Sequence, residues 1–450
     1  MAPDKTGPLP ERFADIKKDI AASYPEFQER ATKAWAEIIQ ALGETTASIV
    51  EKGSEYIPQV YFKDLKNLDR ETVDRIRRVG TVIIRDIVDD AEAAKWKEDL
   101  KTFVKENPDV DGFPEPNKQF FELYWTKPQV KARSHPNLLA ASTWLNQLYH
   151  LKSGAADTTL EGVDLSVPLT YADRFRIRHP GQVWNFHPPH VDGGTIERWE
   201  EPNFRKCFSD ILEGNWRAHD AYDLEGRLNA RTSLYGRPSQ VGPSHSAKYF
   251  GSVLTNAKST VFRTFQGWLA MSETGPGEGT LKTFPDVLLS NAYIILRPFF
   301  RPICSGDALL DPKNWEFDLS SPEFPGIFPK DGGYGGPHPT PLLHPHLQLQ
   351  KTMTSMPKVY PGDAVFWHCD VIHEVEGAHD GSDDSAVMYI PAVPKTPMNL
   401  AYVARQKECF LDGQRPPDFP KGTGEKGWVG VGAVEDVTSQ VGRVAMGLQA

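Results

Sequence analysis

The sequence predicts an α+β, mainly β protein, with a β-sandwich or jelly-roll core that helices precede and long loop insertions interrupt. From Leu169 onward, short apolar or alternating stretches are separated by Gly, Pro and Asn turns, which is typical of an antiparallel core. No strand–helix–strand repeat follows, so a parallel βαβ architecture is disfavoured. With 39% hydrophobic and 11% aromatic residues, the 450-residue chain can bury a substantial core.

Residues 1–60 are expected to form a helical N-terminal extension. Apolar side chains recur there at helical spacing, with an interruption near Pro25 and an end near Gly53. An apolar helix face needs a partner surface, so we expect this extension to pack on the core or to join two copies in a homodimer. The apolar positions are Phe27, Ala31, Trp35, Ile38 and Ile39.

Residues 61–450 are expected to form one domain. It opens with a helix, a β-branched strand from Thr81 to Ile87, and a helix capped by Asp89 or Asp90. Insertions near 197–240 and 305–346, the second containing the Pro/Gly-rich "SSPEFPGIFPKDGGYGGPHPTPLLHPH", are expected to be functional lids, because long loops in compact domains commonly carry function. The core strands are expected in "TYADRFRIRHPG", "STVFRTFQGWLAMS", "GTLKTFPDVLLS", "PGDAVFWHCDVIHEVEG" and "SAVMYIPAVP".

Composition narrows the class of function. The net charge of −10 lacks the basic field that a nucleic-acid surface needs. No run reaches the roughly 18 apolar residues of a membrane span, and the N-terminus lacks the apolar core of a signal peptide. The four cysteines are widely spaced without a CxxC motif, which disfavours a disulfide framework and a thiolate zinc site. We expect a cytoplasmic protein that acts on a small molecule, without nucleic-acid or membrane partners.

Two short motifs indicate a metal site. In "VWNFHPPHVDGGTIERW", His190 and Asp192 are two residues apart, so on a strand both side chains point the same way and can hold one ion. The second motif, "HCD" at 368–370, is followed by His373 with the opposite strand parity. Imidazole plus carboxylate is the ligand set of zinc and of non-haem iron held by two histidines and one carboxylate. An isolated H-x-D pair also arises by chance, so each motif alone is a weak signal.

One site assembled from both motifs explains them better than two partial sites. It would take His190 and Asp192 from one strand and one histidine from the other. The residues alone leave the choice between His368 and His373 open. The apolar run Ala364–Trp367 predicts a buried strand, which places His373 at the following bend, where a side chain can face a cavity.

The pattern "HVD" followed far downstream by "PGD…W…H" resembles the iron- and 2-oxoglutarate-dependent oxygenases, in particular the clavaminate synthase-like, taurine dioxygenase-like and phytanoyl-CoA hydroxylase-like branches. A more extensive resemblance, in "HPPHVDGGTIERW", "FRTFQGWLAMSETGPGEGTL", "LRPFF" and "HCDVIHEV", is to the domain-of-unknown-function 1479 family. This resemblance implies a double-stranded β-helix, a cupin-like jelly roll. It also implies Fe(II) bound by His190, Asp192 and His373, with 2-oxoglutarate and O₂ as co-substrates.

One feature of those oxygenases is missing. Many place an Arg roughly 10 to 15 residues after the distal histidine to pair with the far carboxylate of 2-oxoglutarate. Here that interval, "AHDGSDDSAVMYIPA", contains neither Arg nor Lys. Either another strand supplies the anchor or 2-oxoglutarate is not used. The candidates are Arg263, ranked first, with Thr264 and Gln266 as hydrogen-bonding partners, then Arg174, Arg176, Arg297 and Lys282.

Three further residues are expected to support the ligands. His187 precedes two prolines and is interpreted as structural, while His368 could orient His373 or a ligand carboxylate. Trp184 is expected in the core or the pocket wall.

The favoured function is a non-haem Fe(II)- and 2-oxoglutarate-dependent oxygenase that hydroxylates, desaturates or cleaves a small-molecule metabolite. The missing downstream Arg keeps open an alternative class. That alternative is a cupin-like metal-binding protein without 2-oxoglutarate chemistry, either a binding module or a metal-dependent hydrolase or isomerase.

Overall fold

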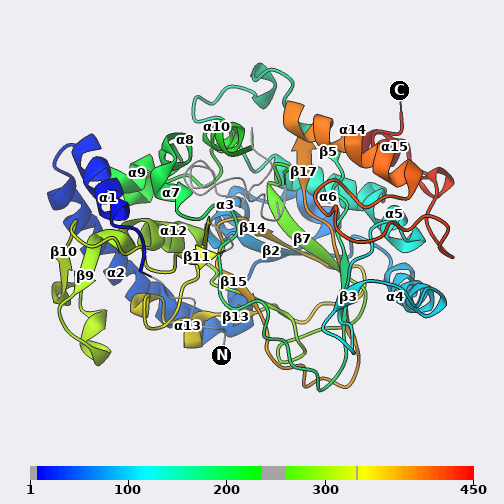
Figure 1. Cartoon of the computed structure of the whole chain (residues 1–450), viewed down its shortest axis with the longest axis horizontal. Helices are drawn as coiled ribbons and strands as arrows, with labels where there is room; N and C mark the ends of the chain where they lie inside the picture. Colours follow the sequence, from blue (N-terminus) through cyan, green and yellow to red (C-terminus); the bar gives the residue numbers. More distant parts are fainter. Residues whose placement is uncertain (1–7, 236–259, 331–332, 450) are drawn as a thin grey trace.

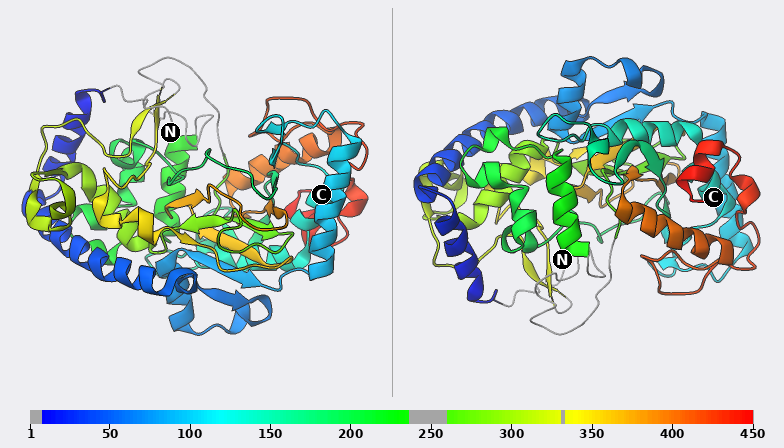
Figure 2. Two further views of the ribbon diagram at one scale, coloured as in Figure 1. Left: turned by 90° about the horizontal axis from the view of Figure 1, so that it is seen from below. Right: turned by 90° about the horizontal axis from the view of Figure 1, so that it is seen from above.

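The structure is a computed structural model that describes residues 8–235, 260–330 and 333–449. Residues 1–7 of the expected extension, 236–240 of the first insertion and 331–332 of the second lie outside the described residues. Figures 1 and 2 show a mixed α/β protein in which the N-terminal helices and the C-terminal helices lie at opposite ends. Within the described residues, none of the helices combines the length and apolar character that a membrane span needs.

An eight-stranded sheet forms the centre of the molecule, in the order β1-β2-β14-β7-β16-β6-β4-β3. Its first pair is parallel and the other pairs are antiparallel. Apart from the pairs β1–β2 and β3–β4, neighbouring strands come from distant parts of the chain, so the sheet depends on long-range pairing. The strands are β1 (Gln59–Tyr61), β2 (Thr81–Arg85), β3 (Gly112–Phe113), β4 (Phe120–Phe121), β6 (Phe175–Arg178), β7 (Phe265–Ala270), β14 (Ala364–His368) and β16 (Ser385–Tyr389).

A smaller antiparallel sheet, β13-β8-β15, lies against one face of the large sheet. The two sheets meet where the ring of Trp367 in β14 lies 5.4 Å from the ring of His373 in β15. The strands of this smaller sheet are β8 (Leu281–Thr283), β13 (Thr354–Ser355) and β15 (His373–Val375). Separate two-stranded sheets pair β5 (Asp164–Leu169) with β17 (Val393–Lys395), β9 (Phe300–Pro302) with β10 (Trp315–Phe317) and β11 (Phe328–Lys330) with β12 (Gly333–Gly335).

The N-terminal helices α1 (Arg12–Ser23) and α2 (Phe27–Lys52) match the predicted helical segment. The apolar face of α2 is buried, and Trp35 stacks on Tyr293 and Phe300 with ring centroids 5.2 and 4.6 Å apart. The extension therefore packs into a second hydrophobic core, which it shares with α12 and the helices of the first insertion. Whether it also forms a dimer stays a prediction.

The remaining helices flank the sheets. The first insertion supplies α7 (Glu197–Glu200), α8 (Pro202–Lys206), α9 (Ser209–Leu212) and α10 (Leu224–Tyr235). The others are α3 (Arg70–Val79), α4 (Asp90–Glu106), α5 (Lys127–Arg133), α6 (Pro136–Asn146), α12 (Val287–Leu296), α13 (Leu349–Thr352), α14 (Pro397–Asp412) and α15 (Gln440–Ala445). Short 3₁₀ turns are η1 (Gly53–Tyr56), η2 (Phe62–Asn67), η3 (Asp157–Thr159), η4 (Trp216–Ala218), η5 (Arg297–Phe299), η6 (Gly306–Leu310), η7 (Pro312–Asn314), η8 (Pro345–Leu347) and η9 (Val434–Asp436).

Two sequence predictions need correction. The strand expected across "GTLKTFPDVLLS" ends at Thr283, and Asp286 then caps α12 by accepting a hydrogen bond from the main-chain N–H of Leu289 at 2.9 Å. Because α12 is buried all round, its apolar run has no helical period that would distinguish it from a buried strand. The strand expected across "STVFRTFQGWLAMS" begins only at Phe265, so Arg263 and Thr264 precede it.

Candidate metal centre

The segment that carries His190 and Asp192 lies alongside β15. The main-chain N–H of His190 donates to the carbonyl of His373 at 3.0 Å, and the N–H of His373 donates back at 2.9 Å. Gly193 and Gly194, with φ of 99° and 85°, then turn the chain towards α7. The segment thus acts as a fourth strand of the smaller sheet.

Three potential ligands converge at this point. Nε2 of His373 lies 3.4 Å from Oδ2 of Asp192, and Nε2 of His190 lies 3.9 Å from Oδ1. The ligand atoms of all three side chains are within 4.8 Å of one another. Metal–nitrogen and metal–oxygen bonds of about 2.0–2.2 Å put neighbouring ligand atoms roughly 3 Å apart, so the side chains need only small shifts to hold one ion.

Both histidine rings are oriented by hydrogen bonds to the nearby main chain. Nδ1 of His190 donates to the carbonyl of Pro188 at 2.7 Å, and Nδ1 of His373 donates to the carbonyl of Val371 at 3.0 Å. A ring that carries its proton on Nδ1 offers the lone pair of Nε2 to an ion. Burial, followed by the neighbouring His373, lowers the pKa of His190 to about 3, so this ring is neutral at physiological pH.

Gln266 of β7 orients the carboxylate ligand. Its Nε2 donates to Oδ2 of Asp192 at 2.9 Å. The sequence predicts Gln266 to be a partner of 2-oxoglutarate, whereas the structure places it behind Asp192. A hydrogen bond of this kind fixes a carboxylate ligand before an ion binds.

Arg176 of β6 lies on the same sheet face as Gln266. Across the sheet, Arg176 is opposite Val387 and Val387 is opposite Ala270, which shares a face of β7 with Gln266. Arg176 is only 3% exposed, and its side chain donates a long hydrogen bond, 3.4 Å from Nη2 to the carbonyl of Gly279. For Nε and Nη1, no hydrogen-bond partner lies among the described residues.

The structure does not bring the other co-substrate candidates to the three ligands. Arg263 stacks over the ring of Tyr171 at 5.4 Å, and Thr264 bonds Oδ1 of Asn146 at 2.6 Å. Both residues precede β7, so the alternation of side chains along that strand, which directs Gln266 to Asp192, does not apply to them.

Three further candidates are engaged elsewhere. Arg297 donates to the carbonyls of Leu343 and Phe300, in the second hydrophobic core. Arg174 pairs with Asp173, and Lys282 pairs with Glu374 at 2.8 Å, on the opposite face of the small sheet from Thr283 and His373.

His187 and Trp184 lie beside the ligands and link them to Arg176. The indole N–H of Trp184 donates to Nδ1 of His187 at 2.9 Å, the two rings are stacked, and the ring of His187 is 6.1 Å from that of His190. The guanidinium of Arg176 lies over the Trp184 ring at 5.7 Å. A series of neighbouring side chains, Trp184 and His187, therefore runs from Arg176 to His190.

One residue near the ligands is absent from the sequence-based prediction. His338, from the Pro/Gly-rich insertion, has its ring 5.9 Å from that of His190. The insertion is attached here by a 3.0 Å bond from the N–H of Val191 to the carbonyl of Pro337. The only sequence signal was the length and composition of the insertion, which predicts a lid but no particular side chain.

The "HCD" motif is a second compact cluster, but its groups are already engaged. Nδ1 of His368 accepts a hydrogen bond from the N–H of Asp370 at 3.1 Å, and its Nε2 donates to the carbonyl of Ala221 at 3.1 Å. Arg198 and Arg227 bond the two oxygens of Asp370. A carboxylate that already accepts hydrogen bonds from two guanidiniums is a poor ligand for a cation. Both ring nitrogens of His368 are engaged in hydrogen bonds, so neither offers a lone pair to a metal. It is therefore His373 that joins His190 and Asp192.

Comparison with known proteins assigns the chain to a family. The sequence model of the Gig2-like family matches residues 7–448. The chain belongs to the Gig2-like family. The uncharacterized protein YbiU of Escherichia coli (strain K12) is 28% identical over 447 residues, covering 96% of this chain and 95% of YbiU.

Solved structures agree with the family and the fold. GlcNAc Inducible Gene 2 from Candida albicans is 29% identical, with a TM-score of 0.81, over 98% of this chain and 90% of that one. The hypothetical protein JW0805 from Escherichia coli is 26% identical, with a TM-score of 0.76, over 99% of both chains. The Candida albicans protein is a member of the domain-of-unknown-function 1479 family, so the family predicted from the sequence is confirmed. Placement of this Gig2-like protein among the 2-oxoglutarate oxygenases is a separate question.

Proposed function

We propose that this Gig2-like protein is an Fe(II)- and 2-oxoglutarate-dependent oxygenase of a small-molecule metabolite. The observation that carries the proposal is a two-histidine, one-carboxylate cluster that faces the side of the large sheet on which Arg176 lies, a buried arginine with no carboxylate partner among the described residues. The cluster matches the ligand set of non-haem iron oxygenases. The arginine, Arg176, matches the far carboxylate of a dicarboxylate co-substrate.

The sheet order supports this assignment. Strands β6, β16, β7 and β14 lie side by side in the large sheet, and the strand that carries His373 lies in the small sheet facing them. The cluster lies between the two layers, where Gln266 of one sheet reaches Asp192. We interpret this arrangement as a double-stranded β-helix, in which ligands from the small sheet face the interior.

Arg176 would replace the arginine that the sequence lacks after His373. A buried guanidinium with two nitrogens that have no hydrogen-bond partner among the described residues is costly, and a carboxylate that accepted hydrogen bonds from them would recover that cost. The face of Trp184 supports one side of the guanidinium. The interval after His373 that lacks an arginine includes β16, and Arg176 of β6 lies opposite Val387 of that strand. The anchor for the far carboxylate would therefore come from β6, the strand next to β16.

The side chains around the proposed site have separate roles. With iron and 2-oxoglutarate bound, the site would supply an oxidant able to remove hydrogen from an unactivated carbon. His190, Asp192 and His373 hold the ion, and Gln266 keeps the carboxylate in place. The two insertions contact the ligand segment through Val191 and Arg198, and would exclude water from the reacting groups.

The test is an anaerobic titration of the protein with Fe(II) and 2-oxoglutarate. We expect a visible charge-transfer band from 2-oxoglutarate on the bound iron and, on admission of O₂, release of succinate. Arg176→Gln should keep Fe(II) binding and weaken 2-oxoglutarate by about 2–4 kcal/mol, or roughly 30- to 1,000-fold, the cost of removing one partner of a buried charged pair. Arg263→Gln is the matched control and should leave both affinities unchanged.

The alternative is a cupin-like metal protein without 2-oxoglutarate chemistry. It would bind a divalent ion through the same three residues but show neither band nor succinate. Equal 2-oxoglutarate affinity in the Arg176→Gln and Arg263→Gln variants would contradict the assignment of the anchor alone. Failure of the wild-type protein to bind 2-oxoglutarate would contradict the oxygenase proposal.

A further inference from the structure

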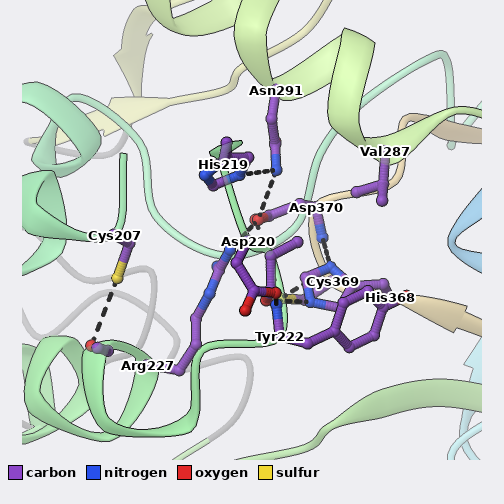
Figure 3. A network of polar contacts seen from close by, with 12 residues as sticks. Cys207, His219, Asp220, Tyr222, Arg227, Val287, Asn291, His368, Cys369 and Asp370 are labelled. Atoms are coloured by element: carbon purple, nitrogen blue, oxygen red, sulfur yellow. Dashed lines mark hydrogen bonds and ion pairs between the residues drawn. The ribbon is translucent and has the colours of Figure 1, made fainter. Parts of the chain in front are cut away.

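Asp370 is a fully buried anion at the centre of a polar network (Figure 3). Its Oδ1 accepts from Nη2 of Arg198 at 2.9 Å, and its Oδ2 accepts from Nη2 of Arg227 at 2.5 Å and from Nδ2 of Asn291 at 3.0 Å. Burial alone would raise the pKa of Asp370, but Arg227 and Arg198 hold it well below its usual range. Asp370 is therefore ionised, and both of its oxygens are occupied by donors.

The donors come from three separate helices. Arg198 lies on α7, Arg227 on α10 and Asn291 on α12. Asp370 itself lies in the turn between β14 and β15, three residues before His373. The first insertion is thus bonded to the turn that presents one of the metal ligands.

Arg198 also reaches a second ligand. The same Nη2 donates to the main-chain carbonyl of Asp192 at 3.4 Å. One side chain, 1% exposed, therefore contacts the main chain at Asp192 and the turn that leads to His373. Arg227 shares the carboxylate of Asp370 but, in the part of the chain that the structure describes, donates no hydrogen bond to the segment 190–192.

We propose that Arg198 and Asp370 are positioning residues that hold the Asp192 and His373 segments at metal-binding separation and couple the insertion helices to the metal. Neither residue contacts the ion. The proposal rests on the metal part of the proposed function and is independent of 2-oxoglutarate. Its physical basis is that groups behind the ligands fix their geometry, and that small displacements of a ligand are costly.

A purely structural role predicts something different. Breaking a buried ion pair destabilises a fold because a charge is left without a partner. In that case, substitutions at Arg198 and Arg227 would both lower the free energy of unfolding without singling out the metal. The two roles are separated by comparing metal affinity with stability in the same variants.

The experiment titrates Co(II) into Arg198→Lys and Arg227→Lys, following the visible absorption of the bound ion, and measures unfolding of the metal-free proteins. Lysine keeps the positive charge, but its Nζ is one bond closer to the main chain than Nη2 of arginine, so it falls short of the position from which Nη2 contacts both Asp370 and Asp192. We expect Arg198→Lys to weaken Co(II) binding by about 10- to 100-fold. Arg227→Lys should lose less affinity at a similar loss of stability, and Arg217→Lys, in a solvent-exposed ion pair, should lose none.

Equal losses of Co(II) affinity in Arg198→Lys and Arg227→Lys would overturn the proposal. If Arg198→Lys fails to fold, hydrogen exchange on the wild-type protein decides. Co(II) should slow exchange in α7 as well as in 371–374, and protection confined to the ligand segments would overturn the coupling. A wild-type protein that binds no Co(II) would contradict the metal site itself, and with it both proposals.

Discussion

His190 and His373 exchange both of their main-chain hydrogen bonds, at 3.0 and 2.9 Å, although they come from distant parts of the sequence. Each ring also donates its Nδ1 proton to the carbonyl two residues before it. The backbone pairing brings the two imidazoles to a centroid separation of 4.2 Å and the side-chain bonds set their tautomers. The cluster is therefore organised for an ion by main-chain contacts.

Removal of one of the three proposed ligands should abolish tight metal binding. We expect His190→Ala or His373→Ala to lower the affinity for Co(II) by more than about 100-fold, because groups behind a ligand are themselves worth 10- to 100-fold. Isothermal titration of the metal-free protein measures this loss. The control is His187→Ala, which removes the hydrogen-bond partner of Trp184 but none of the three proposed ligands, and should bind metal almost as the wild type does. Loss of metal in His187→Ala would reassign the ligand set.

Gln266 should contribute through Asp192. We expect Gln266→Leu to reduce metal affinity by about 10- to 100-fold and to leave the free energy of unfolding of the metal-free protein within about 1–2 kcal/mol of wild type, since it removes one hydrogen bond to a charged group. Metal titration and urea unfolding give the two quantities. An unchanged metal affinity would show that Asp192 does not need this partner.

Stability should fall on acidification because of buried neutral histidines. Burial lowers the pKa of His344 and of His219 to about 3, below the ordinary value of 6.5. Between these values the unfolded chain binds more protons than the folded protein, so the free energy of unfolding decreases as pH falls below 6.5. Each histidine contributes a slope of up to about 1.4 kcal/mol per pH unit.

Urea unfolding at several pH values between 5 and 7 measures that slope. His344→Gln should flatten it by the share of one histidine, since glutamine does not titrate. A slope identical to that of the wild type would mean that His344 takes up no proton on unfolding in this range.

Gly194 should tolerate no side chain. A Cβ there would lie 2.1 Å from Cε1 of Phe204, and its φ is +85°. We expect Gly194→Ala to cost about 1–3 kcal/mol from overpacking, beyond the roughly 1–2 kcal/mol of left-handed strain. Gly181→Ala is the matched control, because its φ is +75° with nothing within 4 Å of the added Cβ. Chemical denaturation compares them, and equal losses would mean that Phe204 moves aside freely.

The sequence predicts helices, helix caps and short ligand motifs well, because residues a few positions apart determine these features. The helical spacing around Trp35 predicted α2, and Asp89 caps α4 by accepting from the N–H of Glu92 at 3.1 Å. The H-x-D spacing placed His190 and Asp192 on one side of the chain. The family resemblance named His373, where residue chemistry alone left His368 open, and the geometry now brings His373 to the other two.

Strand boundaries and pairing could not be read in the same way. Arg263 ranked first as an anchor because a strand was expected to include it, but β7 begins at Phe265 and the Arg263 side chain stacks on Tyr171. Arg176 was one of several equal alternatives. Its place on the Gln266 face follows from the register of β6 with β16 and of β16 with β7.

The sequence by itself determined which residue types could hold a metal and which local segments would be helical, because both depend on neighbours a few positions apart. Only the tertiary structure brought His373 to His190 and Asp192, left Nε and Nη1 of Arg176 without a hydrogen-bond partner among the described residues, and bonded Arg198 to both Asp370 and the carbonyl of Asp192. These outcomes depend on long-range strand pairing and on burial, which set the direction and the partners of each side chain.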